Sequence, residues 1–236
     1  MQTIEQTPAV ETRVVGIIDV DSTNSTYYFG YDVTTLENSF SSMEIDGVTQ
    51  SSIINEYVFS SVGEHTIKLT LKDPTKLKSQ ALRSGDYSRL IIPDNVIDLG
   101  DNSSGYCSYL YDVTIGSNVR LIGEYAFYEN FSLTSINIPD SVQIIENNAF
   151  GGCSSLNNVT IGTGVTQIGN EVFYTIKRNA TFVIKATTPP TFGTQAFRRS
   201  GAGTLYVPSE SLSAYQTALS AYVQSTRPSL TILPIQ

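Results

Sequence analysis

The sequence predicts an α+β repeat solenoid preceded by a small all-β, sandwich-like module, and two observations predict it. Six apolar segments begin 23 residues apart, at positions 90, 113, 136, 159, 182 and 205, and a fixed period of this length is the signature of a solenoid. Ahead of them, residues 12–73 hold short alternating stretches separated by turn residues, which is typical of a β-sandwich. We therefore place a β-rich module at 1–76 and the solenoid at 77–236.

The composition favours a folded protein and excludes several classes of partner. Hydrophobic residues make up 40% of the chain and charged residues 15%, which argues against disorder. A net charge of −8 would repel phosphate backbones, so we expect no nucleic-acid partner. No stretch approaches the roughly 18 apolar residues that a membrane span needs. The opening residues do not resemble a signal peptide, and we expect the sequence to begin after a targeting segment that has been removed.

Each repeat places apolar residues at fixed positions. Ile136 and Ile138 point to one side of an extended strand and Asn137 to the other, after which Val142 and Ile145 return to the core. Between the strands recurs an Ala-Phe type pair that we expect to pack on the outer side of the coil, at Ala126-Phe127, Ala149-Phe150, Val172-Phe173 and Ala196-Phe197. In the unit 100–110 this pair is replaced by Ser103-Ser104, and we expect an irregular outer layer there.

The segment IPDSVQIIENNAFGGCSSLNNVTIG (138–162) resembles the BspA-type leucine-rich repeat. The matching elements are IPxSV at the end of the strand, the I-x-x-x-A-F pair, the G-x-C-x-x-L turn and the next strand. This resemblance, which covers about 130 residues, implies a right-handed leucine-rich-repeat coil with a short parallel sheet on its concave side. It also implies a secreted or surface-anchored protein with an adhesion or ligand-binding role.

The N-terminal module permits two interpretations. YVFSSVGEHTIKLTLKD (57–73) resembles the terminal hairpin of immunoglobulin-like modules of the polycystic-kidney-disease type. An equally plain alternative is a β-rich cap that continues the sheet of the solenoid. His65, the only histidine, is interpreted as a surface strand residue without a Ser or Cys partner for catalysis.

The C-terminal segment, over about 209–236, is expected to cap the solenoid. Ser209 or Ser211 can cap a helix, and Leu212, Tyr215, Leu219 and Tyr222 recur at helical spacing. A final strand at 229–235 would close the open end of the sheet.

No arrangement of residues in the chain predicts catalysis or a cofactor. The chain has no GxSxG, no P-loop and no Cys/His cluster with zinc spacing, so we expect a non-enzymatic protein with no cofactor. Cys107 and Cys153 occupy the same repeat position two units apart, about 9–10 Å by strand spacing, beyond the ~7 Å limit for a disulfide. We expect both to be free and buried. Asp19 and Asp21 alternate as in a calcium loop but lack its Gly and closing Glu, so we expect a polar turn and no metal.

The outward-facing residues of the strands form the candidate ligand-binding strip. It runs through Ile91, Thr114, Asn137, Thr160, Val183 and Tyr206 and is flanked by Asp112, Ser135, Asn158 and Thr181. Extended solenoid surfaces of this kind suit a protein or glycan partner. We therefore predict a monomeric, bacterial cell-surface or secreted protein that binds an extracellular protein or glycan through this strip. The alternative is a structural spacer with no ligand of its own.

Overall fold

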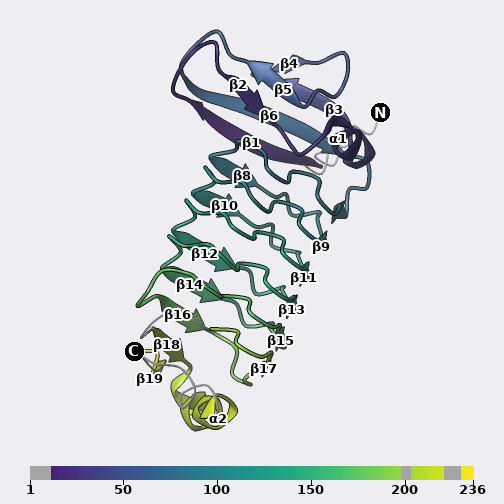
Figure 1. The fold of residues 1–236 in the computed structure, drawn as a ribbon. Coiled ribbons are helices and arrows are strands. Elements are labelled where there is room, and N and C mark those ends of the chain that lie inside the picture. The colour runs from purple at the N-terminus through teal and green to yellow at the C-terminus, as the bar shows by residue number, and fades with distance from the viewer. Residues whose placement is uncertain (1–11, 198–202, 221–229) are drawn as a thin grey trace, which may run out of the picture.

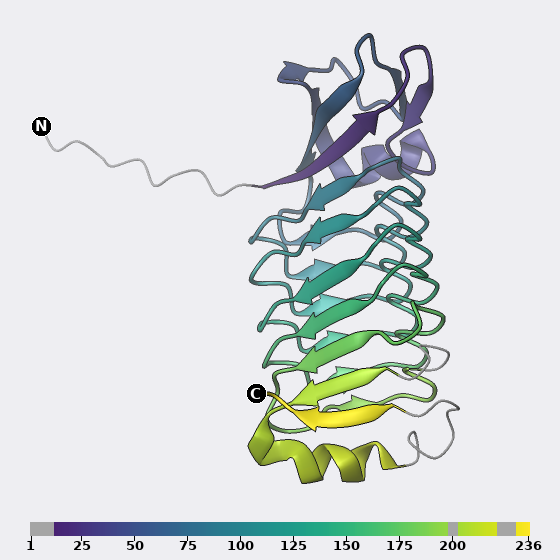
Figure 2. The same ribbon diagram turned by 90° about the vertical axis from the view of Figure 1, so that its left-hand side faces the viewer.

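The computed structural model describes residues 12–197, 203–220 and 230–236 and shows a stack of coils with a capping structure at each end (Figure 1). A front layer of two adjoining sheets, called the front sheet below, runs along the stack, and a second, narrower layer lies behind it (Figure 2). The apolar side chains of both layers fill the space between them. Each coil therefore covers its neighbour, as a solenoid requires.

The six strands that the 23-residue period predicts are confirmed. They form the front sheet and are β8 (Arg89–Ile91), β10 (Asp112–Thr114), β12 (Ser135–Ile138), β14 (Asn158–Ile161), β16 (Thr181–Ile184) and β18 (Thr204–Val207). β8 pairs with β10, and β12, β14, β16 and β18 pair in order, all in parallel; β10 and β12 are neighbours without ladder pairing, so the front sheet has two hydrogen-bonded parts. Residues one period apart face each other, for example Ile136 and Val159. The sequence period is thus the register of the sheet.

The second sheet consists of two-residue strands that the sequence analysis did not recognise as strands. They are β7 (Lys76–Leu77), β9 (Asp98–Leu99), β11 (Leu121–Ile122), β13 (Ile144–Ile145), β15 (Gln167–Ile168) and β17 (Thr191–Phe192). Their second residues mostly point into the core, as expected for Ile122 and Ile145. In the described part of the chain the coils contain no α-helix, so the α+β class is not confirmed; the repeats are built from strands and turns.

The recurring phenylalanines form a ladder inside the stack. Phe127, Phe150, Phe173 and Phe197 stack in turn, with ring centroids 5.4 to 5.8 Å apart. The unit with Ser103-Ser104 keeps the same backbone: Leu82 N–H donates to the Ser103 carbonyl at 2.7 Å, and Ser104 N–H to the Ala126 carbonyl at 2.9 Å. The expected irregularity is therefore wrong for the backbone, because these hydrogen bonds do not depend on the side chain.

The N-terminal strands extend the front sheet. β1 (Arg13–Val20) is antiparallel both to β6 (Gly63–Leu71) and to β8, so the sheet order is β10-β8-β1-β6-β3-β4. The other elements are β2 (Thr26–Tyr28), α1 (Val33–Ser39), β3 (Phe40–Ile45), β4 (Val48–Thr49) and β5 (Glu56–Val58), with β2 paired to β5. This topology is that of a cap continuing the sheet; neither an immunoglobulin-like module nor an all-β sandwich is shown. The division at residue 76 stays a prediction.

Buried contacts join the N-terminal part to the first coil. The Tyr87 hydroxyl donates to the Phe29 carbonyl at 2.8 Å. Its ring lies against Gly16 of β1, where a Cβ atom would come within 2.3 Å of the ring, so only glycine fits. The Arg83 guanidinium lies between Tyr31 and Tyr106, 5.0 and 4.8 Å from the ring centroids. Cation–π contacts on both sides tie the two parts together.

The C-terminal cap follows the predicted order of helix and strand. A 3₁₀ turn, η1 (Ser209–Ser211), leads into α2 (Leu212–Ala218), and β19 (Thr231–Pro234) pairs in parallel with β18. Ser211 stands at the helix N-cap, but its hydroxyl donates to the Thr187 carbonyl instead of capping. Tyr215 is buried and donates to the Ala186 carbonyl. Tyr222 lies outside the described residues.

Candidate functional site

All eight candidate residues of the strip point outward from the front sheet. Strand pairing aligns the six on β12 to β18 in two rows, with Asn137 facing Thr160 and Ser135 facing Asn158, while Asp112 and Thr114 lie on the adjoining strand β10. The exposed members are Asp112, Thr114, Ser135, Asn137 and Asn158, and the half-buried members are Thr160, Thr181 and Tyr206. The structure therefore brings the strip together as one surface, while its role in binding stays a prediction.

The surface that carries the strip is longer than the sequence indicated. Ile91 faces Val15 of β1, Val15 faces Lys68 of β6, and Lys68 faces Glu44 of β3. The sequence analysis left such an extension open, as a cap that continues the sheet of the solenoid, but could not give its register, because antiparallel pairing between β1 and β8 leaves no period in the sequence. The row thus continues from β10 through β8 into the N-terminal cap.

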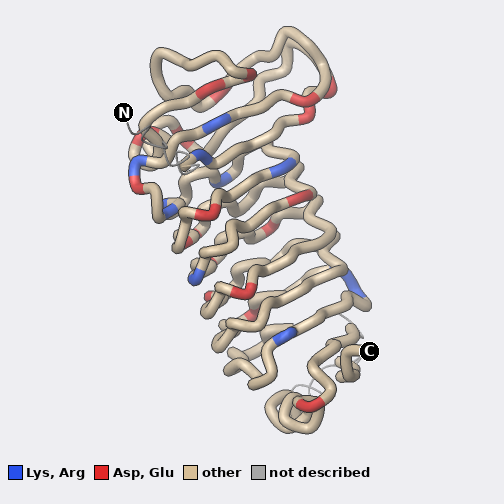
Figure 3. The backbone as a smooth tube through the Cα atoms, turned by 180° about the vertical axis from the view of Figure 1, so that it is seen from behind, with Lys and Arg blue, Asp and Glu red and all other residues tan. Residues whose placement is uncertain are grey.

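Charge divides this surface into two zones. At the N-terminal end, Glu44 lies 3.3 Å from both Arg13 and Lys68, and Arg89 lies 2.5 Å from Glu64. From β12 to β19 both rows consist of uncharged residues, chiefly Ser, Asn and Thr. Figure 3 shows the same contrast between the densely charged N-terminal end and the sparsely charged last coils. A neutral, hydrogen-bonding surface is therefore available over the C-terminal coils.

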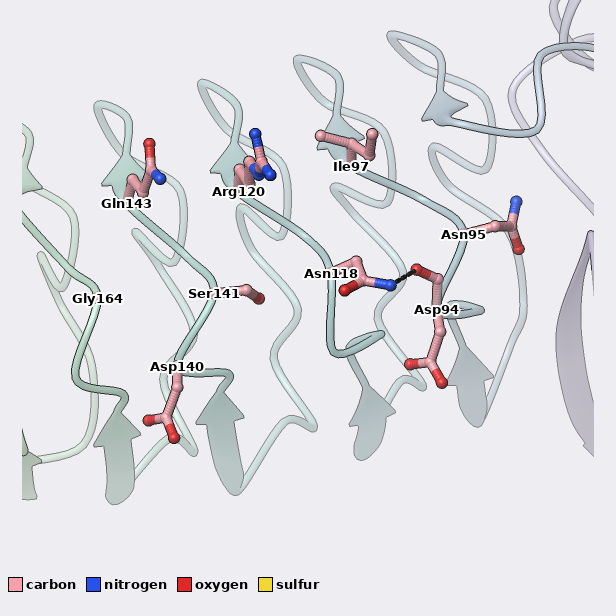
Figure 4. A pocket seen from close by; sticks show the side chains of 9 residues that line it. All are labelled: Asp94, Asn95, Ile97, Asn118, Arg120, Asp140, Ser141, Gln143 and Gly164. Atoms are coloured by element: carbon pink, nitrogen blue, oxygen red, sulfur yellow. Dashed lines mark hydrogen bonds between the residues drawn. The ribbon is translucent and has the colours of Figure 1, made fainter.

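Among the grooves formed by described residues, two adjoin the stack. One, of about 410 Å³, lies at the last coils between Val183, Tyr206 and the β19 residues Leu233 and Pro234. The other, of about 440 Å³, lies on the side where the turns leave the front sheet (Figure 4); it is lined by Asp94, Asn95, Ile97, Asn118, Arg120, Asp140, Ser141, Gln143 and Gly164. Neither was foreseen, since each is formed by residues from several coils.

The turns along the second groove alternate between Pro-Asp and Gly. The Asp94 carboxylate accepts the Ser117 N–H at 2.7 Å, and that of Asp140 accepts the Thr163 N–H at 2.9 Å. The bond from Ser117 lowers the pKa of Asp94. Gly162 is required here because a Cβ atom would lie 2.5 Å from the Asp140 backbone. These aspartates fasten one coil to the next.

Exposed aromatic side chains gather beside the front sheet, on the turns that lead into β10 and β12. Tyr109, Tyr111 and Phe131 are 65%, 41% and 44% exposed. The Ser132 hydroxyl donates to the Ser108 carbonyl at 2.6 Å and holds the two turns side by side. The sequence analysis did not single these residues out, because they do not recur with the period.

His65 is buried, contrary to the expectation of a surface residue. Polar groups lie within hydrogen-bonding distance of both of its ring nitrogens. Its Nδ1 lies 2.6 Å from the Asp46 carboxylate, and its Nε2 lies 3.0 Å from the Ser61 carbonyl and 3.4 Å from the Ser61 hydroxyl. Because a carbonyl only accepts, the closer contact requires a proton on Nε2. A protonated Nε2 cannot take the serine proton, so this cluster is not a hydrolytic triad.

Both cysteines are free and buried, as expected. Burial raises the pKa of Cys107 and of Cys153 to about 12, and each thiol donates to a carbonyl of the preceding coil, Leu82 or Phe127. Asp21 accepts the Tyr27 hydroxyl at 2.9 Å within a polar turn.

Within the described residues, no group of three or more His, Cys, Asp or Glu is placed to hold a metal ion. None of the helices described is long and apolar enough to cross a membrane.

The geometry defines a leucine-rich-repeat solenoid in which a period of 23 residues sets the register of two parallel sheets. The family profile described as BspA type leucine rich repeat region matches residues 33–129 and 75–203, in six copies. The chain belongs to this family, which confirms the resemblance seen in residues 138–162. Proteins built from such repeats are generally non-enzymatic. Among curated proteins, none matches significantly.

Solved structures that are similar to this chain include the following three. A leucine rich cell surface protein from Faecalibacterium prausnitzii A2-165 is 28% identical, over 44% of this chain and 29% of its own, with a TM-score of 0.42. The pneumococcal vaccine antigen PcpA is 18% identical; the match covers 71% of this chain and 46% of PcpA, with a TM-score of 0.51. A leucine-rich repeat protein from Bacteroides ovatus ATCC 8483 is 20% identical; the match covers 69% of this chain and 50% of that protein, with a TM-score of 0.37. The likeness to PcpA shows a shared fold. The chain spans half or less of each of these proteins.

Proposed function

We propose that this chain is a non-catalytic, cell-surface or secreted binding protein whose strip contacts an extracellular protein or glycan. The observation that carries the proposal is the alignment of six polar side chains in two rows on the sheet β12-β14-β16-β18, continued by Asp112 and Thr114 on the adjoining strand β10. Leucine-rich repeat proteins generally serve as interaction modules, and extended solenoid surfaces suit large partners. Membership of the BspA-type family supports the surface location.

The strip has polar groups that are free to bind. The exposed amide of Asn137 makes no hydrogen bond to any described protein group, and the same is true of the hydroxyls of Thr114 and Thr160. Such groups are hydrated in the free protein and can exchange water for a partner at little cost, because the strand backbone already fixes their positions. The chain would act as a monomer that presents this surface.

The test replaces Asn137 and Asn158 together by tryptophan. The matched control is Gln167→Trp, an exposed strand residue on the second sheet. Both proteins are probed against arrays of immobilised extracellular-matrix proteins and of oligosaccharides. The double variant should lose about tenfold or more in affinity for the ligand that the parent protein binds, as for a blocked interface centre, while the control binds normally. Unchanged binding by the double variant would show that the strip is not the binding site.

A structural spacer is the second candidate, and one observation favours it. The residues that recur with the period are almost all buried, so the repeat itself specifies packing alone. A spacer should bind no ligand on either array. It should also tolerate the double tryptophan variant in any assay of the assembly that contains it.

A further inference from the structure

We propose that Tyr109, Tyr111 and Phe131, which we call the aromatic ledge, bind uncharged sugar rings of a glycan. The proposal rests on the binding function proposed above and names the ligand class. The ledge adjoins the strip directly, because Tyr111 precedes Asp112, the first residue of β10. Its rings stand beside the front sheet and are open to solvent.

The ledge is rigid although its rings are exposed. Leu110 and Leu133 are fully buried beside the rings and anchor the two turns in the core. Each turn is closed by a backbone bond, from Leu110 N–H to the Cys107 carbonyl at 3.0 Å and from Leu133 N–H to the Asn130 carbonyl at 3.1 Å. Aromatic rings held on fixed turns lose little conformational entropy when a ligand binds. The ledge is therefore ready to bind without rearrangement.

The faces of the three rings are not covered by other aromatic rings of the described residues, although Tyr111 interacts with Asp19. Stacked or edge-on ring pairs occur throughout this chain, yet none in the described part involves Tyr109, Tyr111 or Phe131. The negative face of an aromatic ring attracts polarised C–H groups, which line one face of many sugar rings. Exposed rings without ring partners are what such a ligand requires.

The charges around the ledge select a neutral ligand. Asp112 is exposed and pairs with no described cation. Asp19 lies close to Tyr111, whose pKa is raised by desolvation and by this carboxylate. The nearby cation, Arg89, is held by Glu64. The field at the ledge is therefore negative, which disfavours sialylated or sulfated glycans.

The remaining neighbours suit sugar hydroxyls better than a protein surface. Short hydroxyl side chains lie close to the rings in the sequence, at Ser108, Ser132, Thr134 and Ser135. A protein interface needs a continuous apolar centre of large side chains, whereas the turns that carry these rings are otherwise rich in polar groups. The aromatic positions are confined to two coils, about 5 Å apart; the equivalents of Tyr109 in later coils are Ser155 and Arg178. The ledge thus fits a short stretch of glycan.

The test measures binding of the full chain to an array of neutral oligosaccharides and to sialylated and sulfated ones. The variants are Tyr109→Ala with Phe131→Ala, and the conservative pair Tyr109→Phe with Phe131→Tyr. Tyr57→Ala, an exposed aromatic on the β2–β5 ribbon, is the control. Thermal melts of every variant check folding, and these rings are too exposed for their loss to unfold the chain.

The parent protein should bind at least one neutral oligosaccharide, and the double alanine variant should lose about tenfold or more in affinity. The conservative pair and the control should stay within about threefold of the parent. Binding only to charged glycans, binding only to proteins, or neutral-glycan binding that survives the double alanine change overturns the proposal. If the strip variant loses a protein ligand while the ledge variants retain it, the proposed function stands and the ledge assignment fails.

Discussion

Replacing Ser103 or Ser104 by alanine should stabilise this protein, although both serines are completely buried. Every backbone amide and carbonyl of the pair is hydrogen-bonded: the Ser103 N–H donates to the Gly100 carbonyl of the same coil, and the other three groups bond to neighbouring coils, as the Ser104 carbonyl does in accepting the Asn130 amide at 3.0 Å. The two hydroxyls, in contrast, meet no protein partner. They occupy the place where other coils have an Ala-Phe pair.

The expected gain in the free energy of unfolding is the hydration cost that the buried hydroxyl no longer imposes, minus the cost of the cavity that its removal leaves. A buried hydroxyl without a partner costs about 1–3 kcal/mol in lost hydration. Removing it vacates at most about 10 Å³, which at about 24 cal/mol per Å³ costs roughly 0.2 kcal/mol. The free energy of unfolding should therefore rise by about 1–2 kcal/mol for each substitution, which corresponds to about 2–4 °C in Tm for each kcal/mol in a chain of this size.

The assay is urea denaturation followed by circular dichroism, with Ser88→Ala as the matched control. Ser88 is also buried, but its hydroxyl donates to the Ile17 carbonyl at 2.9 Å. The control should lose about 0.5–1.5 kcal/mol, the net value of one hydrogen bond. If Ser104→Ala destabilises the protein as much as the control does, its hydroxyl has a partner and the reasoning is refuted.

Three further predictions concern the stack. Phe150→Ala should cost about 3–5 kcal/mol in urea denaturation, because the ring is fully buried between two others, whereas the exposed Phe131→Ala should cost under about 1 kcal/mol. Gly162→Ala should lower the free energy of unfolding by about 1–3 kcal/mol, since its Cβ would collide with the Asp140 backbone. Both cysteines should resist a maleimide at pH 8 until the chain unfolds, because burial raises their pKa to about 12; rapid labelling of the native protein would contradict this.

The periodic part of the fold could be predicted in detail. Ile136, Ile138 and Phe150 recur at fixed spacing because each coil must bury the same face of its neighbour, so the period gives the register directly. The strip followed from the same rule, since strand residues alternate between core and solvent. The backbone at Ser103-Ser104 stayed regular because most of its hydrogen bonds come from neighbouring coils.

The parts without a period could not be predicted in the same way. The second sheet escaped notice because two-residue strands are too short to show alternation. The pairing of Val15 with Ile91 joins segments 76 residues apart, and their antiparallel register leaves no trace in either segment. His65 packs against the Phe59 ring, with centroids 4.2 Å apart, and hydrogen-bonds to Asp46 and Ser61, which lie in turns; none of these contacts is visible in the strand's own sequence. The aromatic ledge was missed because exposure is a tertiary property.

The edge strands at the two ends of the front sheet determine whether a partner can bind by backbone pairing. An exposed sheet edge is a template for pairing with another chain, yet both ends here offer little to pair with. β4 at one end has two residues, and β19 at the other ends in Pro234, which has no N–H to donate. The second sheet has strands of only two residues. Recognition through backbone pairing is therefore disfavoured, which supports our expectation of a monomer. What this solenoid offers a partner is the side chains of its face and of the turns beside it, where the strip and the aromatic ledge meet at Tyr111 and Asp112.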